Sequence, residues 1–319
     1  MSIILKLKRI IKGSRENFHH FGFKVMLAKD ICILTNDSLK STVYKDKTIL
    51  RYLEKKYAFL IDKYKNCNDV NVDFSKTSDL PIWVFWWQGE EQMPDLIKAC
   101  HRSKINCSNN HPVVFIDKNN LHEYITIPEY IWEQFKIGKL KIQHLADIIR
   151  VRLIKEYGGL WLDGSIYCGR VIPNEVYNLP LYSLKKEDGT LRFVSNNKWT
   201  TFLIGGQKNN LLCCFLDEFF MEYCKTGVPF IDYFMFDCAI AMAYKNIPSI
   251  RDSIDAIPYY YDDYYWISKH IKNECTNEII CAFEESNAVF YKIAWNISKD
   301  KMQEKSFYDY LIEKGRTNV

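Results

Sequence analysis

The fold is decided by one stretch, Tyr157-Gly158-Gly159-Leu160-Trp161-Leu162-Asp163-Gly164-Ser165. Its two adjacent glycines can adopt positive φ angles, so they predict the end of a helix followed by a turn. The apolar run 160–162 has the length and composition of a buried strand. Asp163 then falls at the carboxyl end of this strand, where open α/β sheets bind their ligands. The stretch therefore predicts a strand that carries one carboxylate to a cleft.

The surrounding sequence predicts an α/β fold with a mostly parallel sheet flanked by helices. Apolar runs at 82–87 and 112–116 have the form of two more buried strands. Helical patterns alternate with the strands, and a long one over 141–157 leads into the stretch at 157–165. This β-α-β-α-α-β order is typical of parallel strands joined by crossover helices. Further strands are expected at 180–184, 191–195, 200–204 and 289–295, and further helices at 94–103, 128–137, 209–224, 233–245, 248–257 and 306–314.

Residues 1–79 have a different pattern and predict a helical N-terminal appendage to a domain over 80–319. A helical periodicity runs from 46 to 65, and a polar, turn-rich segment follows it. Within residues 1–12, isoleucines and leucines occupy one helical face and basic side chains the other, with only Leu5 misplaced. This is typical of a basic helix that lies on an anionic membrane surface. The alternative is a helix docked on the protein with its basic edge in solvent.

Composition limits the class of protein. A chain of 319 residues with 48% hydrophobic residues is sufficient for one large domain with a substantial core. The net charge of +4 is small for this length and argues against nucleic-acid binding. Eleven cysteines occur without CxxC spacing, so we expect reduced core thiols in a cytosolic protein and no zinc site. We find no cleavable signal peptide and no apolar run long enough to span a bilayer.

Asp147 and Arg150 lie three residues apart on the predicted helix 141–157, so they share a face. One interpretation is a surface ion pair, worth about 0.2–0.5 kcal/mol. The other is that the helix points both groups at the cleft beside Asp163, where a carboxylate suits sugar hydroxyls and a guanidinium suits phosphate oxygens. The geometry expected from the sequence does not choose between the two.

Two further residues have a structural and a functional interpretation. Trp86 falls near the end of the first predicted strand, where it is either a core residue or a platform for a nucleobase. Asp237 falls within the apolar helix expected at 233–245. A buried carboxylate is costly unless it is paired or functional, so Asp237 either pairs with a core cation or belongs to the site.

The segments 146–150 and 157–165 resemble the sugar-binding DxD region of glycosyltransferase family 32. The chain is more closely similar to the bacterial capsular polysaccharide synthesis proteins within that group, over roughly residues 80–297. Weaker support comes from 82–89, 202–206, 232–237 and 291–295. The resemblance implies a GT-A-like (Rossmann-like) fold and a retaining transfer from a nucleotide sugar, most often a UDP-sugar.

The resemblance also implies the site residues. Asp163 matches the first acid of the DxD motif and is one catalytic candidate, and Asp237 is the other. Ser165 replaces the second acid, which binds the metal directly in acid-bearing relatives, and a hydroxyl is a weaker ligand for Mg²⁺ or Mn²⁺ than a carboxylate. Either Asp163 and the diphosphate hold a metal ion, or Lys292 or Arg150 neutralises the leaving group instead. The implied donor-binding residues are Trp86, Gln88, Asp147, Arg150, Gly159, Ser165, Lys292 and Trp295.

The leading hypothesis is a cytoplasmic enzyme that adds a sugar to a lipid-linked capsular or surface polysaccharide, held at the inner face of the membrane by its N-terminal helix. A second hypothesis is a non-catalytic glycan-binding or scaffold subunit with a decayed transferase fold, suggested by Ser165. An aspartate-based phosphotransferase ranks last, because it requires a carboxylate two residues after Asp163. Loops that bind the acceptor are expected within 255–285.

Overall fold

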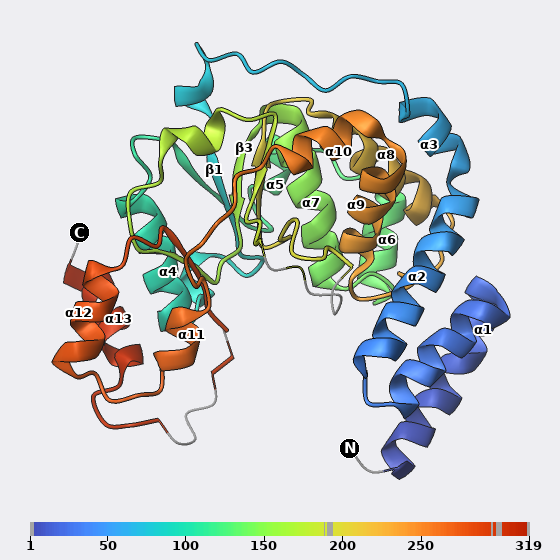
Figure 1. Cartoon of the computed structure of the whole chain (residues 1–319), viewed down its shortest axis with the longest axis horizontal. Coiled ribbons are helices and arrows are strands. Elements are labelled where there is room, and N and C mark those ends of the chain that lie inside the picture. Colours follow the sequence, from blue (N-terminus) through green and yellow to red (C-terminus); the bar gives the residue numbers. More distant parts are fainter. Residues whose placement is uncertain (1–2, 188, 190–193, 295, 298–301, 318–319) are drawn as a thin grey trace.

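The computed structural model describes residues 3–187, 189, 194–294, 296–297 and 302–317. Trp295 and most of the strand expected at 191–195 lie outside these residues. Figure 1 shows a central sheet between two groups of helices, with α1 and α2 at one end of the molecule and α12 and α13 at the other. In the described part of the chain, no helix is long and apolar enough to cross a membrane.

The central sheet has five strands in the order β2-β1-β3-β6-β5. β1 pairs in parallel with both β2 and β3, as the β-α-β order predicted. β6 is antiparallel to both β3 and β5, so the sheet is mixed rather than mostly parallel. The described residues between β5 and β6 contain no helix, and a parallel pair would require a crossover there. The strands are β1 (Ile82–Phe85), β2 (Val113–Ile116), β3 (Gly159–Leu162), β5 (Leu181–Ser183) and β6 (Leu203–Gly206).

Side chains alternate along the strands and build a core on each face of the sheet. Trp83 and Trp161 point into a core shared with the helices on one face, while Leu160 and Leu162 belong to a separate cluster on the other. The helices that follow β1 are α4 (Asp95–Asn106), α5 (Leu121–Tyr124), α6 (Glu129–Lys136), α7 (Ile142–Tyr157), α8 (Leu211–Lys225), α9 (Met235–Asn246), α10 (Pro248–Asp255), α11 (Trp266–His270), α12 (Asn277–Glu285) and α13 (Phe307–Thr317).

A second, two-stranded sheet lies directly after Asp163. β4 (Ile166–Cys168) pairs antiparallel with β7 (Phe290–Lys292), and Ile166 is opposite Lys292. The strand expected at 289–295 is therefore shorter than predicted and pairs outside the main sheet. This pairing brings Lys292 to Asp163 at the carboxyl end of β3.

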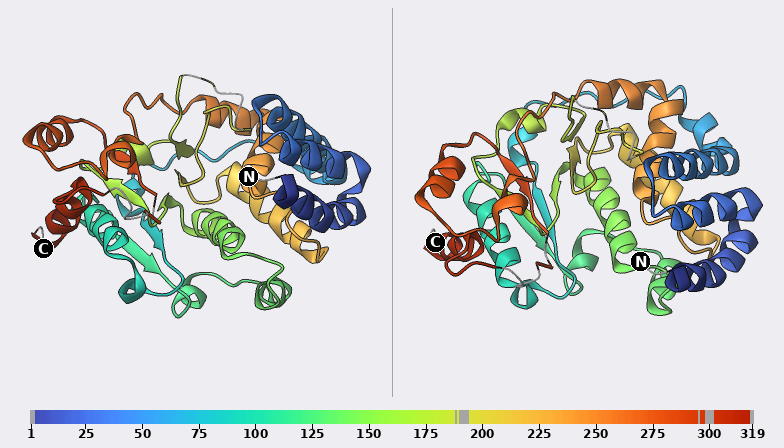
Figure 2. Two further views of the ribbon diagram at one scale, coloured as in Figure 1. Left: turned by 90° about the horizontal axis from the view of Figure 1, so that it is seen from below. Right: turned by 60° about the horizontal axis from the view of Figure 1, so that its bottom comes forward.

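The N-terminal segment forms α1 (Ile3–Leu34), α2 (Leu39–Lys56) and α3 (Ala58–Tyr64), with a kink in α1 at Gly22. Ile49 and Leu53 of α2 are fully buried in the core that also contains α8 and α9. Figure 2 shows α1 and α2 side by side at one end of the molecule, away from the C-terminal helices. The domain boundary at 79–80 stays a prediction.

Candidate functional site

Asp163 lies at the carboxyl end of β3, where its backbone N–H donates to the carbonyl of Phe202 at 2.9 Å. Its Oδ1 accepts from the indole of Trp161 at 2.9 Å and from Arg150 at 3.2 Å. Its Oδ2 accepts from the Lys292 ammonium at 3.0 Å. Two cations and one indole therefore hold this carboxylate in a fixed orientation.

Arg150 is buried, so its pairing with Asp147 is not the surface ion pair that the sequence left open. The guanidinium lies 3.5 Å from Asp147 Oδ1, donates to the carbonyl of Thr201, and stacks 4.9 Å from the centre of the Trp161 ring. Only 6% of the Arg150 side chain and 15% of the Asp147 side chain are exposed. One buried arginine therefore links Asp147 to Asp163.

Lys292 reaches the site because β7 pairs with β4. The amide of the next residue, Ile293, donates to the Ser165 carbonyl at 3.0 Å, which fixes the strand end beside the turn. The Lys292 ammonium then donates to Ser165 Oγ at 2.8 Å and to Asp163 Oδ2 at 3.0 Å, and it lies 5.0 Å from the centre of the Phe202 ring. An ammonium group thus lies between the residues at the two ends of the DxD-like motif.

The residues of this cluster leave few free oxygen ligands for a divalent cation. A hard cation such as Mg²⁺ or Mn²⁺ requires several oxygen ligands with free lone pairs. Both oxygens of Asp163 already accept from cations, and Ser165 accepts from Lys292. Across the described residues, no three His, Cys, Asp or Glu side chains are grouped so that they could hold a metal ion.

The three carboxylates of this region have different acidities. Burial alone would raise the pKa of Asp163, but Lys292 and Arg150 outweigh it and hold that pKa below its usual value. Burial raises the pKa of Asp147 to about 7, against the opposing effect of Arg150. Burial likewise raises the pKa of Asp237 to about 6. Asp163 is therefore ionised at neutral pH, whereas the pKa values of the other two carboxyls lie close to neutrality.

The turn after Asp163 is packed on both sides. The ring of Trp86 lies against Gly164, since a Cβ atom at Gly164 would be 3.1 Å from Trp86 Cε3. From the α4 side, the fully buried ammonium of Lys104 donates to the Gly164 carbonyl at 3.1 Å. Trp86 thus lies against the turn that follows Asp163, and its role in binding a donor stays a prediction. Gln88 is exposed in the following turn, with no side-chain hydrogen bond to another described residue.

Gly159 is not brought into this cluster. It begins β3, at the opposite end of the strand from Asp163. Its φ of 100° is unfavourable for other residues, and a Cβ atom there would lie 2.2 Å from the Pro81 carbonyl oxygen. The geometry therefore gives Gly159 a packing function between β3 and the start of β1.

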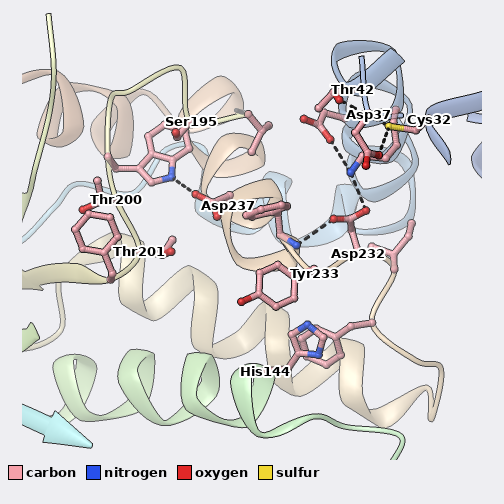
Figure 3. Close-up of a pocket in the computed structure, with 18 of the residues that line it drawn as sticks. Cys32, Asp37, Thr42, His144, Ser195, Thr200, Thr201, Asp232, Tyr233 and Asp237 are labelled. Atoms are coloured by element: carbon pink, nitrogen blue, oxygen red, sulfur yellow. Dashed lines mark hydrogen bonds and ion pairs between the residues drawn. The ribbon is translucent and has the colours of Figure 1, made fainter. Parts of the chain in front are cut away.

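A cavity of about 1060 Å³ adjoins the cluster (Figure 3). Asp237 lines it and accepts a hydrogen bond from the indole of Trp199 at 3.0 Å. Among the described residues, no lysine or arginine forms an ion pair with Asp237, so the core salt bridge considered from the sequence is not its explanation. The cavity extends from the loop over 194–202 to α1 and α2, which the sequence assigned to an appendage.

Sequence reasoning missed Trp161, Trp199 and Lys104. Each contacts a site residue through a side chain that the sequence pattern assigns to the core or to a helix surface. The one usable signal was Lys104, a lysine within the apolar repeat of α4, because a buried lysine requires a polar partner.

The fold and the site define an α/β protein with a carboxylate–cation cluster at the carboxyl ends of its parallel strands. More particularly, the chain belongs to the capsular polysaccharide synthesis protein family, which matches residues 30–311. Over 114 residues it is 27% identical to the O-glycosyltransferase braB of Annulohypoxylon truncatum. That match covers 32% of this chain and 26% of the relative, so the chain spans about a quarter of the relative's length.

Among solved structures, the chain is similar to one described as PaToxG Glycosyltransferase. The TM-score is 0.40 at 11% identity, over 84% of this chain and 95% of that chain. Membership of glycosyltransferase family 32 and a bacterial source stay predictions.

Proposed function

We propose that this protein is a retaining glycosyltransferase that moves a sugar from a nucleotide sugar, most simply a UDP-sugar, to a lipid-linked capsular or surface polysaccharide. One observation carries the proposal: Arg150 and Lys292 converge on Asp163 beside Trp86, at the strand ends where α/β sheets bind ligands. Similarity to a named O-glycosyltransferase supports the same reaction class. A donor bound here stacks its base on Trp86 and presents its sugar to Asp147.

The reaction requires stabilisation of a leaving diphosphate. The bond between the anomeric carbon and the diphosphate oxygen breaks, and its electron pair leaves with the diphosphate. The acceptor hydroxyl forms the new bond on the same face of the sugar, and its proton passes to the departing diphosphate. Preorganised cations are an effective way to stabilise such charge, and Lys292 and Arg150 are both held in place before the donor arrives.

We assign the charge-stabilising role to Lys292 and Arg150 rather than to Mg²⁺ or Mn²⁺. The Lys292 ammonium is within 3.0 Å of Asp163 and 2.8 Å of Ser165. The Lys292 ammonium then supplies positive charge beside Ser165, where the second acid of the motif would hold a metal ion, so Ser165 is compatible with activity. Transfer that is abolished by EDTA and restored by Mn²⁺ would contradict this assignment.

We also propose that α1 contacts the membrane surface. Among its described side chains, α1 exposes five large apolar ones, namely Ile11 at 74%, Phe18 at 55%, Phe23 at 59%, Leu27 at 36% and Leu34 at 53%. An apolar face with nearby basic residues is suited to the boundary between headgroups and acyl chains. The amphipathic sequence pattern of residues 1–12 and these exposed side chains support the proposal together.

Isothermal titration calorimetry with a panel of nucleotide sugars, with and without Mn²⁺, tests the function. We expect saturable binding of at least one UDP-sugar, and its loss in Trp86→Ala. If no nucleotide sugar binds under either condition, the proposal fails.

A non-catalytic glycan-binding subunit is the second candidate, because Ser165 replaces the expected acid. The two candidates differ in turnover. Release of UDP from a bound donor, in the presence of acceptor or of water alone, excludes the non-catalytic function.

A further inference from the structure

We infer that the 1060 Å³ cavity is the site of the acceptor saccharide, and that α1 and α2 form its outer wall. The inference rests on the proposed function and adds to it the place and chemical class of the acceptor. The sequence placed the acceptor site within 255–285. In the structure only Tyr264 and Tyr265 of that segment line the cavity, so we assign most of the acceptor site to other segments.

The cavity and the charged cluster share residues. Phe202 lines the cavity and also lies 5.0 Å from the Lys292 ammonium. Thr201 lines it too, and its carbonyl accepts from Arg150. Only Thr201 and Phe202, which directly precede β6, therefore separate a saccharide in the cavity from the donor site. Its terminal hydroxyl is positioned to meet the donor sugar.

The lining is chemically suited to a saccharide. Sugars present apolar ring faces to aromatic side chains and hydroxyl groups to polar ones. Tyr233, Phe234 and Tyr265 are 62%, 44% and 45% exposed, which leaves their rings available to a ligand. Asp237 and Thr200 add hydrogen-bonding groups to the same lining. Such a mixture of aromatic surface and few placed polar groups is typical of small-molecule sites.

His144 provides an independent indication of a ligand. Only 6% of the residue is exposed, and neither ring nitrogen has a hydrogen-bond partner of good geometry in the described chain. The ring stacks on Phe230 at 4.3 Å, and it lies on the cavity wall (Figure 3). A buried polar group without a partner is costly, whereas a ligand hydroxyl would satisfy it.

The outer wall is fixed rather than loosely placed. Lys45 of α2 pairs with Asp232 at 3.0 Å, and both side chains are largely buried. Lys29 of α1 donates to the carbonyl of Ile231 at 2.6 Å. Figure 3 shows residues of α1 and α2, among them Cys32 and Thr42, facing the cavity across from Thr200. The wall therefore holds a defined shape, as a specific site requires.

The volume indicates more than one sugar unit. Typical small-molecule pockets occupy about 300–1,000 Å³ and hold drug-sized ligands. A cavity of about 1060 Å³ is at the top of that range. We therefore expect an oligosaccharide, such as the end of a growing chain, rather than a monosaccharide.

The test uses a glycan array of defined oligosaccharides and monosaccharides, probed with the full chain in the presence of UDP. Two variants change the cavity from opposite walls: Tyr265→Ala removes an aromatic face, and Thr42→Trp fills space. Tyr261→Ala is the matched control, because Tyr261 is in the same loop as Tyr265, is 76% exposed and does not line the cavity. Calorimetric UDP affinity of each variant is measured in parallel.

We expect the wild type and Tyr261→Ala to retain the same oligosaccharide, and both cavity variants to lose about tenfold or more of that affinity with UDP affinity unchanged. The inference is overturned if both cavity variants bind like the wild type. It is also overturned if a wild type that binds UDP retains no oligosaccharide. If the protein binds no nucleotide, the proposed transferase function is overturned. The glycan array then still shows whether the cavity binds an oligosaccharide.

Discussion

Lys292 is the residue at which the contribution of one positive charge to the transfer rate can be measured. Lys292→Met removes the ammonium but keeps most of the apolar stem over Phe202. We expect transfer to fall about 100- to 1,000-fold, the usual effect of removing one preorganised charge-stabilising donor. Lys292→Arg should recover part of it. Initial rates of UDP release in the presence of EDTA provide the measurement.

The control for this substitution is Lys136→Met, which removes an exposed lysine paired with Glu129 at 2.9 Å and far from the cluster in the fold. It should leave the rate unchanged. A Lys292→Met variant with wild-type kcat would contradict the role assigned to the ammonium. So would wild-type transfer that requires Mn²⁺, because the metal would then be the normal source of charge.

Asp147 gives the stability of the protein a characteristic pH dependence. Its pKa is about 7 in the folded state because the carboxyl is buried, against 3.8 as the ordinary value. Between about pH 4 and 7 the folded state therefore retains a proton that the unfolded chain has released. From this group alone, the free energy of unfolding falls as pH rises through this window, by at most about 1.4 kcal/mol per pH unit. His101 and His144 act in the opposite direction between about pH 4 and 6.5, because burial lowers the pKa of each imidazole to about 4.

Urea unfolding at a series of pH values measures this slope. Asp147→Asn should remove the contribution of this carboxyl and make the slope more positive by up to about 1.4 kcal/mol per pH unit. The slope that remains combines Asp237, whose pKa burial raises to about 6, with the opposing His101 and His144. Asp163 does not contribute in this window, because its lowered pKa places its effect below pH 4. A slope that is identical in Asp147→Asn and the wild type would contradict the assignment.

Within single elements, local sequence was sufficient to predict β3 and α7. The Gly158-Gly159 turn and the periodicity of 142–157 depend on neighbouring residues only, so both elements appear close to the expected bounds. The β4–β7 pair was not predictable in this way, because 129 residues separate Lys292 from Asp163. The resemblance to a family indicated Lys292 as a site residue. The periodicity of the sequence could not predict that β7 pairs with β4.

The indole side chains illustrate the same limit within the site. Trp161 lies in an apolar run and Trp199 lies between polar residues, and most tryptophans in either setting only pack. Their N–H groups instead donate to Asp163 and Asp237. Composition and spacing cannot distinguish a packed indole from one whose N–H holds a carboxylate, because the difference is a side-chain direction set by tertiary packing.

Gly159 tests how strictly the start of β3 depends on one residue. Gly159→Ala places a Cβ atom 2.2 Å from the Pro81 carbonyl oxygen, at a φ of 100°. We expect a loss of about 3–5 kcal/mol in the free energy of unfolding, or no soluble protein. Gly227→Ala is the control, since its φ is also positive at 64° but no atom lies within 4 Å; it should cost only about 1–2 kcal/mol.

Denaturant unfolding of the two variants gives the comparison. Equal losses in both would mean that backbone strain, and not the contact with Pro81, makes glycine necessary at 159. A loss under about 1 kcal/mol at Gly159 would contradict the described packing of β3 against the start of β1.

At the scale of the whole molecule, α1 connects two proposed activities. The half of α1 before the kink at Gly22 carries Ile11 and Phe18 in solvent, while Lys29 and Cys32 of the other half line the cavity. A helix that lies on a lipid surface would therefore bring the cavity close to a lipid-linked acceptor. The sequence predicted only the first twelve residues for this role, because the exposed face beyond them depends on how α1 packs.

This arrangement predicts that membrane contact and sugar transfer are separable. The double variant Phe18→Ser and Phe23→Ser removes two exposed apolar side chains, at 55% and 59% exposure. Burial of one phenylalanine contributes about 1.5–3 kcal/mol, so vesicle affinity should fall at least tenfold. Cosedimentation with vesicles of phosphatidylglycerol and phosphatidylcholine measures it, and added salt should weaken binding of the wild type.

The matched control is Phe59→Ser, which removes a side chain of α3 that is 54% exposed. It should bind vesicles like the wild type. Because α1 contributes no residue to the charged cluster, the double variant should transfer sugar to a soluble oligosaccharide at the wild-type rate and lose rate only with a vesicle-bound acceptor. Equal vesicle binding by the double variant and Phe59→Ser would show that α1 does not lie on the membrane.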